Sequence, residues 1–139
     1  MPDTDTRRVT LLVYSSSATV RERVRNALGT RPAPDVEIDI VEATTGAEVV
    51  ARCDEGDIDV ALLDGEAAPT GGLGLCRQLK DELDAPPPVL VLVGRRDDAW
   101  LATWCRAEGV IQHPVDAMQI TDAVLALVPR PGSALATGH

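Results

Sequence analysis

One carboxylate in the middle of the chain is placed where chemistry is possible. The segment 58–64 is apolar apart from Asp59 until it ends on Asp64, and a glycine follows. Its residues 60–63 leave no polar face, which is typical of a central strand covered on both sides in a parallel sheet. Open α/β sheets bind their ligands at the carboxyl ends of such strands. Asp64 is therefore the first candidate site residue.

A hydroxyl-rich loop, Ser15-Ser16-Ser17-Ala18-Thr19, forms a second polar cluster after the first apolar segment. Hydroxyls at this point can cap a helix, and we favour capping by Ser17 or Thr19. A loop of this kind can also hold a phosphate group at a helix N-terminus. A flavodoxin-like phosphate-binding or FMN-binding protein is thus an alternative. The loop lacks a glycine, however, and the chain has no Phe, one Tyr and two Trp to flank a flavin.

Five apolar segments alternate with helical patterns and turn signals along the chain. Strands are predicted at 8–14, 36–41, 58–64, 89–93 and 110–112, and the last helix is predicted from Ile120 to Val128. Right-handed crossovers and coverage of both faces favour a (βα)5 α/β domain, a doubly wound parallel sheet in the flavodoxin-like order 2-1-3-4-5. We expect one domain over 8–128, with disordered tails at 1–7 and 129–139.

Composition narrows the classes of partner. The 139 residues carry a net charge of −9, which argues against nucleic acid because phosphate contacts need clustered Lys and Arg. Arg21, Arg23 and Arg25 are predicted to spread around a solvated helix. No apolar run approaches the ~18 residues of a membrane span, and the polar N-terminus is unlike a signal peptide. We therefore expect a cytoplasmic protein without membrane contact.

The three cysteines, Cys53, Cys76 and Cys105, are widely spaced and form no C-x-x-C pair. Their number is odd, which does not fit a disulfide framework. We expect them to be small buried apolar residues in a reducing compartment.

The chain resembles the receiver domain of two-component response regulators from about Arg7 to Val128. Its third predicted strand ends in an Asp, and the loop 64–75 is similar to the family's Asp-x-x-x-Pro-x-x-x-Gly-x-x-Leu loop, with Pro69 one place late. The segment 88–94 resembles the family's fourth strand. His113-Pro114 falls on the family's Lys-Pro.

This resemblance implies a role for each of five positions. The phosphoacceptor would be Asp64. Family members hold Mg²⁺ with two acids after the first strand, contact the phosphoryl group with a Thr or Ser at the end of the fourth, neutralise it with the Lys, and carry an aromatic residue on the fifth. In this chain those positions hold, in the same order, Ser15 with Ser16, Val93, His113 and Val110.

The replacement of the family's residues at these positions affects phosphoryl transfer to Asp64. Phosphoryl transfer to a carboxylate needs cations that neutralise charge on the phosphoryl oxygens, and serine hydroxyls are poor ligands for Mg²⁺ compared with carboxylates. We therefore expect an atypical single-domain response regulator that acts by protein–protein contact. We expect Mg²⁺-dependent phosphorylation to be lost or weak, with no bound metal or cofactor and no enzymatic turnover.

The alternative is a receiver that still accepts a phosphoryl group on Asp64 from a histidine kinase, with Mg²⁺ as cofactor. In that case Glu66 and His113 would stand in for missing groups, and His113 would be cationic. His113 is explained equally well as a turn residue before a cis Pro114.

Two tryptophans predict an interface. Trp100 and Trp104 are spaced i,i+4 and share one face of a predicted helix, which is apolar nearly all round. That is more apolar surface than one buried stripe requires, so part of it is predicted to meet a protein partner. The resemblance implies that helix 4, strand 5 and helix 5 form an output and dimerisation face, so a homodimer is possible.

Overall fold

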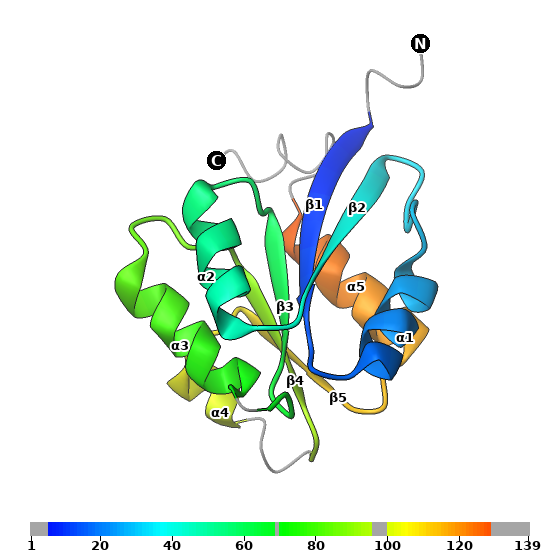
Figure 1. Ribbon diagram of the computed structural model, residues 1–139. Coiled ribbons are helices and arrows are strands. Elements are labelled where there is room, and N and C mark those ends of the chain that lie inside the picture. The colour runs from blue at the N-terminus through cyan, green and yellow to red at the C-terminus, as the bar shows by residue number, and fades with distance from the viewer. Residues whose placement is uncertain (1–5, 69, 96–99, 129–139) are drawn as a thin grey trace.

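The computed structural model describes residues 6–68, 70–95 and 100–128, in which strands and helices alternate (Figure 1). The strands are β1 (Arg7–Tyr14), β2 (Val36–Ala43), β3 (Val60–Asp64), β4 (Val89–Val93) and β5 (Gly109–Gln112). The helices are α1 (Ala18–Leu28), α2 (Gly46–Glu55), α3 (Gly72–Glu82), α4 (Trp100–Trp104) and α5 (Ala117–Leu127).

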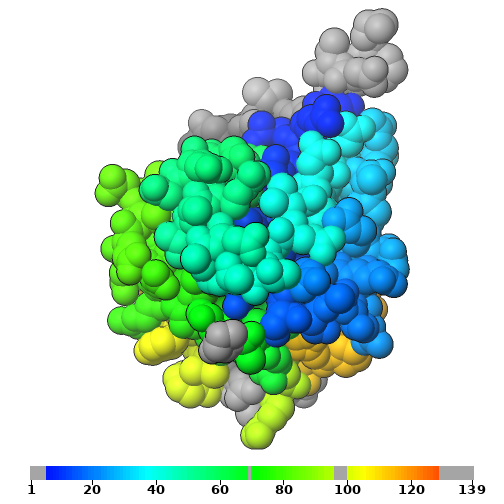
Figure 2. Space-filling view, viewed as in Figure 1, coloured from blue at the N-terminus to red at the C-terminus, as the bar shows by residue number. Residues whose placement is uncertain are grey.

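The strands form one parallel sheet in the order β2-β1-β3-β4-β5, which confirms the predicted topology. Helices α1 and α5 cover one face, and α2, α3 and α4 cover the other (Figure 1). Figure 2 shows α2 and α3 covering most of their face of the sheet. The described chain is thus a three-layer α/β domain.

The position of β3 in the middle of the sheet explains why its sequence does not alternate between apolar and polar residues. All five of its residues are buried. Ala61 and Leu63 pack beneath α2 and α3, whereas Val60 and Leu62 pack beneath α1 and α5. Because successive side chains of a strand point to opposite faces, a strand with helices on both faces needs apolar residues at every position.

Element bounds differ from the prediction at several ends. Arg7, predicted in the tail, begins β1, and β2 extends to Ala43 because it pairs with β1 along its full length. The last helix begins at Ala117 rather than Ile120, since Asp116 caps it by accepting the N–H of Gln119. Segment 96–99, where a turn is predicted to lead into the fourth helix, lies outside the described residues, as do Pro69 and most of the predicted tails (1–5 and 129–139).

The three cysteines are free and buried, as predicted. They belong to the cluster beneath α2, α3 and α4. Burial, and next the charge of Asp57, raises the pKa of the Cys53 thiol to about 11. Burial also raises the pKa of the Cys76 thiol, whose Sγ donates to the backbone oxygen of Cys105 at 3.2 Å. These thiols therefore act as packed apolar groups.

The start of α3 packs tightly against the end of β3. A Cβ atom on Gly72 would lie 2.7 Å from the carbonyl carbon and oxygen of Asp64, whereas a Cβ on Gly74 would meet nothing within 4 Å. Both glycines belong to the same helix. Close approach of the backbones therefore requires glycine at Gly72 but not at Gly74.

This difference gives a matched test of packing. We expect Gly72→Ala to lower the free energy of unfolding by about 1–3 kcal/mol, because the added methyl group must displace backbone. Gly74→Ala should raise it by about 0.5–1 kcal/mol, since alanine is the better helix former. Urea denaturation followed by circular dichroism measures both. Equal stability of the two variants would contradict the close contact.

Candidate functional site

The carboxylate of Asp64 is buried and bonded at both oxygens. The residue is 2% exposed at the carboxyl end of β3, between β1 and β4. Its Oδ2 accepts the hydroxyl hydrogen of Ser15 at 2.8 Å. Its Oδ1 accepts the N–H of Glu66 at 2.9 Å and lies 3.0 Å from Nε2 of His113. The structure thus brings together four of the residues singled out from the sequence.

The serine loop between β1 and α1 supplies one side of the site. Ser15 is fully buried, and its Oγ also accepts the N–H of Ser17 at 3.0 Å. Ser17 caps α1 by accepting the N–H of Val20, as the sequence indicated. Ser16 accepts the N–H of Ala68, at 3.1 Å, from the loop after β3. The three hydroxyls therefore bind Asp64, the helix end and the neighbouring loop.

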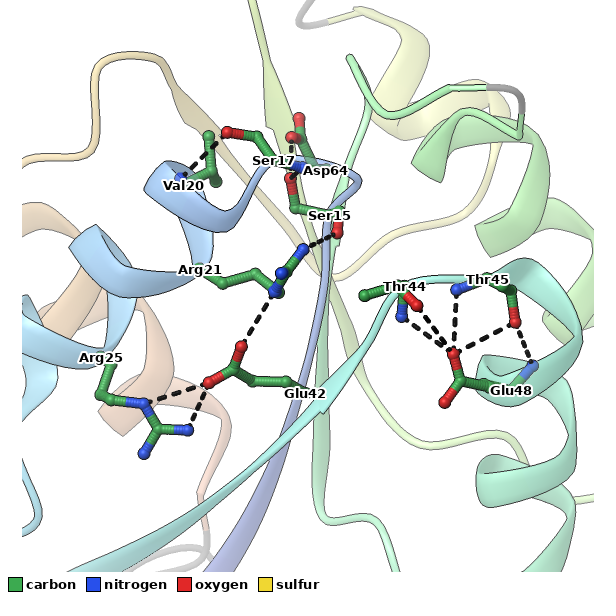
Figure 3. Close-up of polar contacts among 10 residues, drawn as sticks. All are labelled: Ser15, Ser17, Val20, Arg21, Arg25, Glu42, Thr44, Thr45, Glu48 and Asp64. Atoms are coloured by element: carbon green, nitrogen blue, oxygen red, sulfur yellow. Dashed lines mark hydrogen bonds and ion pairs between the residues drawn. The ribbon is translucent and has the colours of Figure 1, made fainter.

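An arginine on α1 binds the backbone of the serine loop (Figure 3). Arg21 donates from Nη1 to the backbone oxygen of Ser15 at 2.6 Å and from Nε to Glu42 at 2.9 Å. Arg25 also binds Glu42, and the hydrogen bonds from Arg25 and Arg21 lower the pKa of that carboxyl. The sequence predicts Arg21 on a solvated helix face, but its side chain is only 15% exposed. The signal that was missed is an acid at the end of β2, beside the start of α1.

The phenol of Tyr14 joins the site to the loop after β3. Its hydroxyl donates to the backbone oxygen of Thr70 at 2.6 Å. Burial, and next the negative charge of Asp64, raises the pKa of this phenol. Tyr14 therefore remains protonated at neutral pH and serves as a donor between the two loops.

His113 approaches Asp64 from the end of β5. Its backbone N–H donates to the carbonyl oxygen of Val93 at 2.8 Å, and its peptide bond to Pro114 is cis. Its side chain is partly buried, and the ring reaches Asp64. The two explanations drawn from the sequence, a turn residue before cis Pro114 and a partner of the aspartate, are therefore compatible.

The other two positions implied by the resemblance hold apolar side chains. Val93 is buried in the cluster beneath α2, α3 and α4, and its side chain offers no hydrogen-bonding group. Val110 is partly buried against the same cluster. Neither residue can contact a phosphoryl group through a hydroxyl.

The backbone N–H of Glu66 binds Asp64, but the side chain of Glu66 lies beside Gly94. A Cβ atom on Gly94 would come within 2.9 Å of the carboxyl carbon of Glu66, so this carboxylate lies against the residue that follows β4. Ser15 and Ser16 follow β1, which is the neighbour of β3 on the other side. Glu66 and the serine loop therefore flank Asp64 from opposite sides.

The residues of this site do not fit Mg²⁺. Magnesium prefers carboxylate oxygens and near-octahedral geometry. Among the described residues of the site, Asp64 has no second carboxylate beside it on the side of β1. Ser15 and Ser16, which lie there, are bonded hydroxyls, and Glu66 lies on the β4 side. Within the described residues, no group of three or more His, Cys, Asp or Glu side chains is arranged to hold a metal ion.

The two tryptophans lie on the surface of α4. Trp100 is 64% exposed and Trp104 46%, whereas Ala102 faces inward. The guanidinium carbon of Arg77 lies 4.8 Å from the ring centre of Trp104. Met118 on α5 is a further exposed apolar side chain. The sequence left open whether the tryptophan face points inward; the structure turns it outward.

Relatives of known family, rather than a family model, identify the family of this chain. No family model matches it. Two response regulatory proteins of Mycobacterium tuberculosis, from strains CDC 1551 and H37Rv, are each 52% identical over 132 residues, covering 94% of this chain and 98% of the relative.

Solved structures agree with the fold. The receiver domain of a LuxO repressor protein from Vibrio parahaemolyticus matches with a TM-score of 0.75 and 18% identity, covering 96% of this chain and all of that one. The receiver domain of the regulator NarL from Mycobacterium tuberculosis matches with a TM-score of 0.71 and 24% identity, covering 86% and 95%. In the described part of this chain, every helix is too short or too polar to span a bilayer. The order of the strands, the aspartate at the end of β3 and the 52% identity together show that the chain belongs to the response regulators of two-component signalling, with β1 to α5 forming the receiver domain.

Proposed function

We propose that this receiver signals through protein–protein contact and that Mg²⁺-dependent phosphorylation of Asp64 is lost or weak. The observation that carries the proposal is the Ser15–Asp64 hydrogen bond of 2.8 Å. A neutral hydroxyl holds the aspartate from the β1 side, where the family places an acid pair. The proposal assigns the protein to the cytoplasm and gives it no enzymatic turnover and no cofactor.

The charges at the site support this proposal. Phosphoryl transfer spreads negative charge over oxygens that must be neutralised by cations. Among the described residues that contact Asp64, only His113 can carry a positive charge; Ser15 donates a neutral hydroxyl and Glu66 a backbone N–H. A phosphoryl group on Asp64 would also be attached to an oxygen that already accepts a hydrogen bond.

One observation favours the alternative, a receiver that accepts a phosphoryl group from a histidine kinase. His113 lies 3.0 Å from Asp64, at the position of the family's lysine. A protonated imidazole there would supply part of the missing charge. The FMN-binding alternative has no such support, because the hydroxyls of Ser15, Ser16 and Ser17 are engaged within the protein.

The proposed contact surface is the face of α4, β5 and α5. It includes Trp100 and Trp104, and it fits a protein partner or a second copy of the chain. Exposed tryptophans are enriched among the residues that dominate binding energy at interfaces. The net charge of −9 argues against nucleic acid as the partner.

Phosphorylation can be tested directly on the purified protein. We expect incubation with acetyl phosphate and Mg²⁺ to leave the intact mass unchanged, because the charge on the phosphoryl oxygens is not neutralised. The control is Asp64→Ala treated in the same way. A gain of one phosphoryl group that disappears in Asp64→Ala would support the kinase-acceptor alternative instead.

Restoring the acid pair should restore metal binding. We expect Ser15→Asp/Ser16→Asp to bind Mg²⁺ at least about tenfold more tightly than the wild type, because carboxylates replace hydroxyls beside Asp64. Isothermal titration calorimetry measures the affinity, and Ser17→Asp serves as a control, since Ser17 caps α1 instead. Tight Mg²⁺ binding by the wild type would contradict the proposal.

Removing the exposed tryptophans should weaken the association of this protein with itself or with a partner. We expect Trp100→Ala and Trp104→Ala each to weaken self-association or partner binding by at least about 1–2 kcal/mol. Truncation of an aromatic residue that is buried in an interface typically has an effect of this size. Analytical ultracentrifugation over a range of concentrations measures the first, and pulldown measures the second. Unfolding by urea should be little affected, since both side chains are exposed. Unchanged association and unchanged partner capture would remove these residues from the interface.

A further inference from the structure

We propose that Glu66 is a charge gate that keeps phosphate groups away from Asp64. The inference rests on the proposed loss of phosphorylation and names a residue that contributes to it. It concerns the β4 side of the rim, whereas the missing acid pair concerns the β1 side. The ligand class that the gate excludes is the phosphate anion, including the acyl phosphates that donate phosphoryl groups.

The position of the Glu66 carboxylate carries the proposal. Its backbone N–H binds Oδ1 of Asp64 at 2.9 Å, so the residue begins at the site. Its side chain then crosses to Gly94, where a Cβ atom would lie 2.9 Å from the carboxyl carbon and 2.9 and 3.2 Å from the two oxygens. Gly94 directly follows Val93, the strand end that the family uses to contact the phosphoryl group. A carboxylate therefore occupies the rim where a phosphate oxygen would be received.

Among the described residues no cationic group binds this carboxylate, and Glu66 is exposed. Asp64 itself is 2% exposed, so an anion must approach it across the rim. A phosphate that approaches Asp64 from the β4 side therefore meets the charge of Glu66. Like charges about 4–6 Å apart at a surface repel by roughly 1 kcal/mol in water and more at lower dielectric, which corresponds to about a fivefold to tenfold loss of affinity.

Glycine at position 94 makes the arrangement possible. The nearest atoms to an added Cβ all belong to the end of the Glu66 side chain. A methyl group on Gly94 would therefore displace this flexible carboxylate rather than backbone. Gly94→Ala thus moves the proposed gate without changing the charge of the protein.

The test measures binding of inorganic phosphate, with no metal and no phosphoryl donor, by NMR titration of the backbone amides of residues 65, 66, 94 and 113. We expect Glu66→Gln to bind phosphate about fivefold to tenfold more tightly than the wild type, and Gly94→Ala to shift affinity in the same direction. The control is Glu82→Gln, which removes an equal charge at the far end of α3 and should leave the affinity unchanged. The difference should shrink as salt is raised, since screening weakens a charge effect but not a change of fold.

Equal phosphate affinity in the wild type and Glu66→Gln would overturn the proposal, and so would no measurable binding in either, because another feature would then exclude the anion. A gain that persists unchanged in high salt would overturn it as well. None of these outcomes depends on phosphoryl transfer. Failure of the gate is therefore distinguishable from failure of the proposed function, which would appear as phosphorylation of the wild type by acetyl phosphate.

Discussion

The need to stabilise one buried carboxylate governs the structure around the site. Asp64 is 2% exposed, and a charge removed from water is costly unless hydrogen bonds or opposite charges compensate it. Three groups from three loops do so: the hydroxyl of Ser15, the N–H of Glu66 and the ring of His113. Each loop follows a strand of the sheet, so the parallel order β1-β3-β4-β5 is what allows them to meet.

The hydrogen bonds that satisfy Asp64 also order the loops that supply them. Ser15 is itself fixed by the N–H of Ser17 and by Arg21, and Arg21 is fixed by Glu42 at the end of β2. The network thus extends from β2 through α1 to β3 (Figure 3). Connected polar groups in a buried setting support one another, and removing one leaves the rest unsatisfied. These hydrogen bonds therefore order the side of the rim that the serine loop forms.

Much of this fold could be predicted from the sequence, because its strongest signals are local. The unbroken apolar runs of β3 and β4 are typical of central strands, and the alternation with helices favours a parallel order. The end of α4 could not be predicted. Arg106 stands there at a φ of 63°, and the N–H groups of Arg106 and Ala107 bind Thr103 and Ala102. This is a helix-ending arrangement usually made by glycine, so the sequence carried no stop signal.

The candidate site was predictable in its members but not in its contacts. The position of Asp64 followed from the strand pattern, and Ser15, Ser16 and His113 followed from the spacing of the family's motif. That Glu66 lies on the β4 side could not be predicted, because it depends on the space above Gly94, a contact 28 residues away in sequence. The role of Arg21 was missed for a similar reason: a surface helix pattern does not reveal which arginine reaches a loop carbonyl.

The exchange of acids for serines changes what the stability of the rim depends on. Carboxylates gathered at one rim repel one another, and a bound cation stabilises such a site in proportion to its concentration and affinity. Here one carboxylate lies among neutral donors and an imidazole, so the folded state has no such repulsion on the β1 side to relieve. Both oxygens of Asp64 are therefore hydrogen-bonded by groups of the protein itself. On the proposed loss of phosphorylation, a signal carried by this receiver comes from what meets its surface.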